Sequence, residues 1–123
     1  MPKRVLSVGQ CGPDTAALSR FLTQHFQVEL VAAQLPDDAF ERLAEKPFDL
    51  VLVNRKLDAD YSDGIDVLKA IKSDPRFNPT PVMVVSNYPE THDEAVAAGG
   101  ERGFGKLEYS KPETVNRLRR FLG

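Results

Sequence analysis

Polar side chains stand directly after short apolar runs in this chain. Asn54 follows the run at 50–53, and Ser86 follows a second run at 82–85. An aspartate at position 54 would be able to act as a nucleophile or a metal ligand, whereas an asparagine has no carboxylate and only donates and accepts hydrogen bonds. The neutral amide at the end of the first run therefore limits the chemistry available there.

Other residue types with catalytic or ligand potential are sparse. Cys11 is the single cysteine, and His25 and His92 are far apart, with no third ligand at metal spacing. The chain has no G-x-G-x-x-G, no P-loop, no nucleophile elbow and no Ser-His-Asp set. We therefore expect a protein that is not an enzyme and that has no catalytic residues, no cofactor and no metal site.

Length and composition define the class of protein. The chain has 123 residues, of which 41% are hydrophobic, so we expect a single domain over 1–123 with its own core. No secretory leader or membrane-spanning stretch is visible, and a lone cysteine suits a reducing compartment, so we expect a cytoplasmic protein without a membrane partner. A net charge of -2 argues against a nucleic-acid partner.

Strand and helix patterns alternate along the chain, which favours a parallel sheet with helical crossovers. Five helices are expected, opening at Asp14 or Thr15, Pro36, Gly64, Thr91 and Pro112. Strands are expected at 4–8, 27–32, 50–53, 82–85 and 103–106. Right-handed crossovers then favour a flavodoxin-like three-layer αβα sandwich, with five parallel strands in the order 2-1-3-4-5.

This topology predicts where the functional site lies. The carboxyl ends of parallel strands meet at one edge of the sheet, where open α/β folds bind their ligands. The residues that this places together are Gly9, Gln10, Asn54, Ser86 and Lys106. We expect them around one crevice, although they are far apart in the sequence.

Four short motifs resemble a known family across the whole chain. They are FDLVLV at 48–53, DG at 63–64, PV at 81–82 and AG at 98–99. In this order and spacing they are similar to the CheY-like receiver domain of bacterial two-component response regulators. That family accepts a phosphoryl group on an aspartate at the end of the third strand. By this resemblance, Ser86 matches the family's hydroxyl and Lys106 matches the lysine that contacts the phosphoryl group.

The remaining functional positions of the family are altered. The acidic pair that holds magnesium falls on Gly9 and Gln10, and the phosphoacceptor falls on Asn54. Without carboxylates the site is expected to lose magnesium, and an asparagine cannot form an acyl phosphate. We also expect Lys106 to have no carboxylate neighbour in the crevice, which gives the site a charge of about +1.

The switch elements of the family are altered as well. Its inward-turning aromatic falls on Gly103, with Phe104 one step later, and Leu107 replaces the proline after the lysine. The loop after Asn54 is longer than in the family. These departures predict a degenerate pseudo-receiver that signals without phosphorylation.

The resemblance implies a protein partner, such as a histidine kinase or an output protein. It implies a monomer or a weak homodimer, with the interaction surface on the fourth helix, fifth strand and fifth helix. Arg117 and Arg120 on the last helix are the candidate contacts for an acidic partner. Three alternatives stay open: phosphorylation relocated to Asp58, Asp60 or Asp63, a flavodoxin-like protein that binds a small ligand or an anion, and a regulatory piece of a longer chain.

Overall fold

The computed structural model describes residues 2–123 and contains one parallel sheet with the strand order β2-β1-β3-β4-β5. The strands are β1 (Lys3–Val8), β2 (Val28–Ala33), β3 (Leu50–Asn54), β4 (Val82–Val85) and β5 (Glu101–Phe104). The helices are α1 (Gly12–His25), α2 (Pro36–Glu45), α3 (Gly64–Ser73), α4 (Pro89–Ala97) and α5 (Pro112–Leu122), with a 3-10 turn η1 (Lys106–Glu108) before α5. The predicted fold and strand order are confirmed.

The apolar runs at 50–53 and 82–85 form central strands that are buried on both faces. Along β3, Val51 and Val53 pack into one hydrophobic cluster, while Leu50 and Leu52 pack into the other. The four side chains of β4 alternate in the same way, because successive side chains of a strand point to opposite faces. Unbroken apolar sequence is what such doubly covered strands require.

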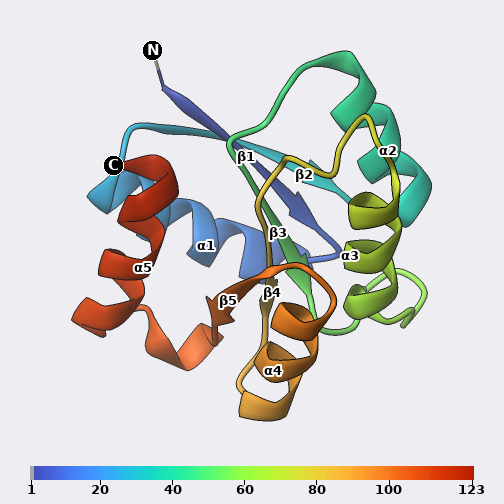
Figure 1. The fold of residues 1–123 in the computed structure, drawn as a ribbon. Coiled ribbons are helices and arrows are strands. Elements are labelled where there is room, and N and C mark those ends of the chain that lie inside the picture. Colours follow the sequence, from blue (N-terminus) through green and yellow to red (C-terminus); the bar gives the residue numbers. More distant parts are fainter. Residues whose placement is uncertain (1) are drawn as a thin grey trace.

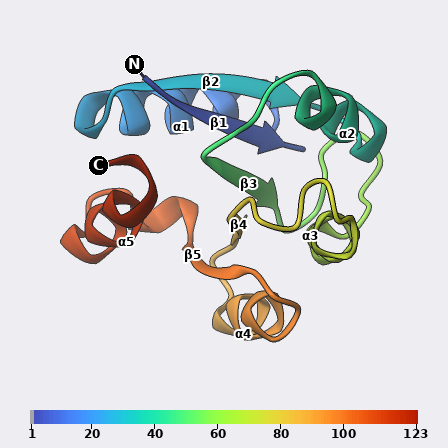
Figure 2. The ribbon, with the colours of Figure 1, turned by 45° about the horizontal axis from the view of Figure 1, so that its top comes forward.

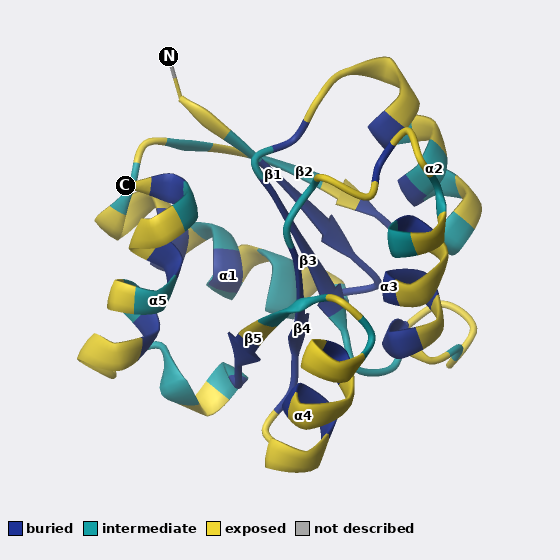
Figure 3. Ribbon diagram, in the orientation of Figure 1, coloured by how far each residue is buried: buried dark blue, intermediate teal, exposed yellow. Residues whose placement is uncertain are grey.

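The helices cover the two faces of the sheet in separate layers (Figures 1 and 2). α1 and α5 pack on one face, and α2, α3 and α4 pack on the other. Figure 3 shows the buried strands in the middle and the exposed outer sides of the helices. Within residues 2–123, no helix is long and apolar enough to span a membrane.

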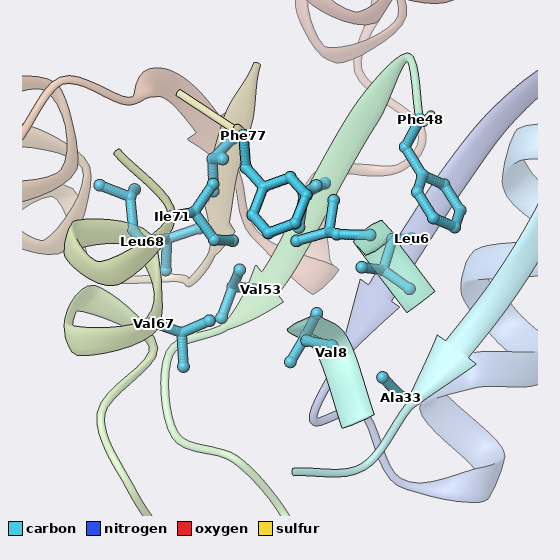
Figure 4. Packing of buried hydrophobic residues seen from close by; sticks show 14 of the residues in the cluster. Leu6, Val8, Ala33, Phe48, Val53, Val67, Leu68, Ile71 and Phe77 are labelled. Carbon is cyan, nitrogen blue, oxygen red and sulfur yellow. The ribbon is translucent and has the colours of Figure 1, made fainter. Parts of the chain in front are cut away.

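The larger cluster lies between the sheet and α2, α3 and α4. Figure 4 shows Val8 and Val53 from the sheet facing Val67 of α3, with Ile71 and Phe77 further along the same layer. Leu57, from the loop after β3, belongs to this cluster and is fully buried. The core therefore extends to the carboxyl edge of the sheet, where the candidate site was expected.

The predicted bounds of β1, β2 and β3 differ from the observed ones by one residue, and larger differences occur at β5, α1 and α4. β5 spans Glu101–Phe104 and not 103–106, because the backbone N–H of Gly105 turns away to donate to the Glu108 carboxylate at 2.8 Å. α1 and α4 begin earlier than predicted, each with a proline in its first turn, where the missing N–H costs nothing. Lys106 therefore opens η1 and does not end a strand.

Candidate functional site

A crevice of about 200 Å³ opens at the carboxyl edge of the sheet, between the ends of β3, β4 and β5. Its lining combines the predicted Asn54, Ser86 and Lys106 with residues that the sequence analysis did not single out. The lining residues are Asn54, Arg55, Lys56, Ser86, Asn87, Tyr88 and Lys106. The name "the crevice" refers to this set below.

The side chain of Asn54 forms hydrogen bonds with the backbone of the two segments next to the end of β3. Its Nδ2 donates to the carbonyl oxygen of Lys56 at 2.7 Å and, more weakly, to that of Gly9 at 3.5 Å. Both partners are acceptors, so this position needs a donor, which an ionised carboxylate does not provide. The neutral amide is therefore matched to its surroundings.

Gly9 joins β1 to α1 in a conformation that a side chain rarely adopts. Its φ is +79°, and a Cβ built on it would lie 2.4 Å from Cγ of Leu57 and 2.9 Å from Cα of Leu57. Leu57 occupies the space beside Gly9 into which a side chain at position 9 would point. A side chain at position 9 is thus incompatible with the observed place of Leu57.

The loop from 55 to 63 is folded so that Leu57 stays in this place. The N–H of Leu57 donates to the Ser62 carbonyl at 2.9 Å, and the N–H of Tyr61 donates back to the Leu57 carbonyl at 2.8 Å. Tyr61 has a φ of 57°, in the left-handed region. An ion pair between Lys56 and Asp63 at 2.7 Å closes the base of the loop.

The part of the crevice formed by the loop after β4 is polar and open. Ser86 Oγ accepts a hydrogen bond from the N–H of Tyr88 at 3.0 Å, so its own hydroxyl hydrogen stays available as a donor. Asn87 Oδ1 accepts from the N–H of Leu107 at 3.3 Å, which ties the loop after β4 to η1. The guanidinium of Arg55 lies over the ring of Tyr88, 4.8 Å from its centroid.

Lys106 has a carboxylate partner, contrary to expectation. Its Nζ donates to Oδ2 of Asp14 at 2.5 Å, across 92 residues of sequence. This hydrogen bond lowers the pKa of the Asp14 carboxyl below its usual value, and burial opposes the shift. The expectation that Lys106 has no carboxylate neighbour is therefore wrong, and Arg55 and Lys56 add further positive charges to the crevice lining.

Asp14 also contributes to the environment of an aromatic stack behind η1. Tyr109 stacks on Phe21 with ring centroids 4.6 Å apart. Burial, with a smaller contribution from the Asp14 charge, raises the pKa of Tyr109 to about 12. Tyr109 is therefore a packing residue and not a proton donor near neutral pH.

Gln10, the second altered acidic position, does not line the crevice. Its side chain is buried, with 3% of its surface exposed, and neither Oε1 nor Nε2 has a hydrogen-bond partner within the described residues. A side-chain amide in that setting is not the ligand set of a divalent cation, which prefers carboxylates.

The magnesium that this fold uses in receiver domains does not fit the residues present. Position 9 has no side chain, Asn54 directs its amide nitrogen to carbonyls, and the crevice lining contains no carboxylate. No group of three His, Cys, Asp or Glu side chains suited to a metal ion occurs in the part of the chain that the structure describes.

The switch position of the family has no room for an aromatic side chain. A Cβ built on Gly103 would lie 2.1 Å from the carbonyl oxygen of Val84. Phe104 is fully buried on the α1 and α5 side, where its ring packs beside the stacked pair of Phe21 and Tyr109. Neither residue is placed to move between an exposed and a buried position.

The two arginines predicted as an interaction surface make contacts within the chain. Arg117 donates to the Gly103 carbonyl at 2.6 Å, and Arg120 lies 3.4 Å from the Glu101 carboxylate. Arg120 is the more exposed of these two. Their role in partner binding stays a prediction.

Sequence reasoning missed Asp14, Arg55, Leu57 and Tyr88 as parts of the site. Arg55 and Leu57 follow Asn54 directly, and Tyr88 lies two residues after Ser86. These three residues could have been found in the sequence because they lie next to, or two or three positions from, predicted site residues. Asp14 has no such signal, because it reaches Lys106 only through the packing of α1 beside η1.

Comparison with known proteins identifies the fold. No protein-family model and no curated protein sequence matches the chain. Among solved structures, the chemotaxis response regulator CheY4 of Vibrio cholerae matches with 21% identity and a TM-score of 0.75, over 99% of this chain and 100% of that chain.

Two receiver domains give similar results. That of a DNA-binding response regulator from Colwellia psychrerythraea is 22% identical with a TM-score of 0.79, over 96% of both chains. That of an HD domain-containing protein from Pseudomonas fluorescens is 20% identical with a TM-score of 0.79, over 98% of this chain and 94% of that chain. The chain therefore has the fold of the CheY-like receiver domains of response regulators.

Proposed function

We propose that this chain is a pseudo-receiver domain, a non-enzymatic cytoplasmic module of bacterial two-component signalling that regulates by binding a protein partner without being phosphorylated. The observation that carries the proposal is the hydrogen bonding of Asn54. Its amide donates to the carbonyls of Lys56 and Gly9, where a phosphoacceptor would need a free carboxylate. The receiver fold supports the signalling context.

The surroundings of Asn54 support the same proposal. In-line transfer to an aspartate needs a cation and a free lysine to stabilise the charge of the transferring phosphoryl group. Here Lys106 is paired with Asp14, and Leu57 fills the space beside Gly9. The missing nucleophile at position 54 is therefore accompanied by a paired Lys106 and by a leucine at the place of the acidic pair, although Ser86 is retained.

Relocated phosphorylation has less support. Asp60 accepts hydrogen bonds from the N–H and hydroxyl of Ser62, at 2.9 and 2.6 Å, which lower its pKa. Asp63 is paired with Lys56, and Asp58 is exposed. None of the three aspartates lines the crevice that holds Ser86 and Lys106.

Incubation with acetyl phosphate and magnesium, followed by intact mass spectrometry, tests the proposal. We expect no covalent adduct on the chain, while a receiver domain with a complete acidic set is modified in the same tube. A stable adduct mapped to Asp58, Asp60 or Asp63 would contradict the proposal and support relocation.

Restoring the nucleophile alone sharpens the test. The Asn54→Asp variant gains a carboxylate but no cation site, so we expect it to stay unmodified by acetyl phosphate. The binding half of the proposal is tested by pull-down with and without the phosphodonor, which we expect to give the same profile. Dependence of binding on the phosphodonor would contradict it.

A further inference from the structure

Arg55 is the crevice cation without a carboxylate partner. Lys56 is paired with Asp63 and Lys106 with Asp14, whereas Arg55 forms no ion pair with any residue of the range 2–123. Its guanidinium is positioned over the Tyr88 ring instead. A planar, weakly hydrated guanidinium in this setting is suited to bidentate recognition of a carboxylate.

The crevice offers an anion further donors and no repulsion from its lining. The hydroxyl hydrogen of Ser86 is available, because its oxygen already accepts from the N–H of Tyr88. The lining contains three cationic side chains and no acidic one, and because Asp63 and Asp14 neutralise Lys56 and Lys106, the net positive charge comes from Arg55. A carboxylate that enters the crevice therefore meets donors and a net positive charge.

Two exposed apolar residues belong to the segments that form this opening. Tyr88 is 52% exposed and Leu107 is 80% exposed, and both belong to the few large hydrophobic residues that face solvent in the described chain. Tyr88 lines the crevice, and the backbone of Leu107 is bonded to Asn87 beside it. Exposed aromatic and aliphatic side chains around an arginine are typical of the centre of a protein interface.

We propose that the crevice and its rim form the docking site for an acidic segment of a partner protein. An aspartate or glutamate of the segment binds Arg55 and Ser86, and a neighbouring apolar side chain packs on Tyr88 and Leu107. Charge complementarity selects this occupant. The inference rests on the proposed function as a binding module, to which it adds the surface and the kind of partner.

Selection from a phage library of random dodecapeptides on the immobilised wild-type chain tests the inference. The selected peptides are synthesised, and their affinities are compared for the wild type, Arg55→Glu, Leu107→Ser and a control, Arg20→Glu. Arg20 is an exposed arginine on α1 that does not line the crevice. Circular dichroism checks that each variant is folded.

We expect the selected peptides to carry an acidic residue next to an apolar one. Charge reversal in Arg55→Glu should weaken their binding by more than about tenfold, and Leu107→Ser by about fivefold, while Arg20→Glu should bind as the wild type does. The affinity should also fall with rising salt concentration.

Three outcomes would overturn the inference: no enriched peptide, enriched peptides without acidic residues, or equal binding to Arg55→Glu. Peptides that lose affinity in Arg120→Glu but not in Arg55→Glu would move the interface to α5 and leave the proposed function intact. Displacement of the acidic peptides by inorganic phosphate alone, without any contribution from Leu107, would show an anion site and not a protein dock. The proposed function itself would be removed only by an adduct in the phosphodonor assay or by partner binding that depends on the phosphodonor.

Discussion

The two halves of the sheet's carboxyl edge differ in how they are packed. On the side of β1 and β3, Gly9 lies against Leu57 and accepts a hydrogen bond from Asn54, and Leu57 is fully buried in the same cluster as Val53. On the side of β4 and β5, Ser86 and its neighbours still line an open cavity. The β1 and β3 half is therefore part of the core, whereas the β4 and β5 half is open to solvent.

This difference predicts how the two halves respond to substitution. Changes among Gly9, Asn54 and Leu57 should act on the free energy of unfolding, because these residues are part of the packing. Changes at Arg55 and Leu107 should act on binding and leave stability nearly unchanged, because Leu107 is exposed and Arg55 forms no ion pair within residues 2–123. The predictions below test this division in order of decreasing effect.

Gly9→Asp should have the largest effect. The substituted residue must adopt a φ of +79° and place its Cβ 2.4 Å from Cγ of Leu57. Together these costs should destabilise the fold by about 4 kcal/mol or more, measured by urea unfolding. Gly12→Asp is the matched control, because nothing lies within 4 Å of its Cβ position. Equal stability of the two variants would contradict the coupling between Gly9 and Leu57.

Leu57→Ala should be the next most damaging. Leu57 has 0% exposed surface, so its truncation should lower the free energy of unfolding by about 3 kcal/mol. Leu107→Ala removes the same atoms from a side chain that is 80% exposed and should change stability by less than about 0.5 kcal/mol. A change in the free energy of unfolding as small as that of Leu107→Ala would show that Leu57 is not part of the core.

Asn54→Asp should destabilise the chain by about 2 kcal/mol at neutral pH. The introduced carboxylate would face the carbonyls of Lys56 and Gly9 and could not donate to either. Only a protonated carboxyl could donate to these carbonyls, so the loss of stability should be largest at neutral pH and smaller in acid. Asn54→Ala should cost less, because it adds no charge. A variant as stable as the wild type would show that the amide is incidental.

The fold was predictable from the sequence because its signals are local. Continuous apolar runs at 50–53 and 82–85 identify central strands, and alternation with helices fixes a parallel sheet. Boundaries were less accurate at β5, where the strand ends because Glu108 binds the N–H of Gly105. The two residues of this contact are three positions apart in the sequence, and the pattern of hydrophobic residues does not indicate it.

The site was predictable only in part. Strand order placed Asn54, Ser86 and Lys106 together, since each follows or lies near the end of its own strand. The pairing of Asp14 with Lys106 depends on how a helix packs beside a turn, and the insertion of Leu57 depends on a loop with a left-handed residue. Both are tertiary effects that periodicity and spacing do not encode.

Asp14→Asn should have the smallest effect on the free energy of unfolding, and it also changes the peptide-binding side of the edge through Lys106. The folded-state pKa of Asp14 is lowered by the hydrogen bond from Lys106, so the pair stabilises the fold above the unfolded-state pKa of about 4 and loses this contribution as the pH falls through the folded-state value. The side chains of Lys106 and Asp14 are 31% and 37% exposed, which limits the gain to about 1 kcal/mol or less.

Urea unfolding of the wild type and Asp14→Asn across acidic pH should show curves that differ at neutral pH and converge when Asp14 is protonated. A constant difference at every pH would show that the ion pair is not its cause. Asp14→Asn also removes the carboxylate partner of Lys106, which lines the crevice. The acidic peptides that depend on Arg55 should therefore bind this variant more tightly than the wild type. If Asp14→Asn lowers the free energy of unfolding and raises the affinity for the peptides, the residues that stabilise this edge of the sheet are distinct from those that bind a partner.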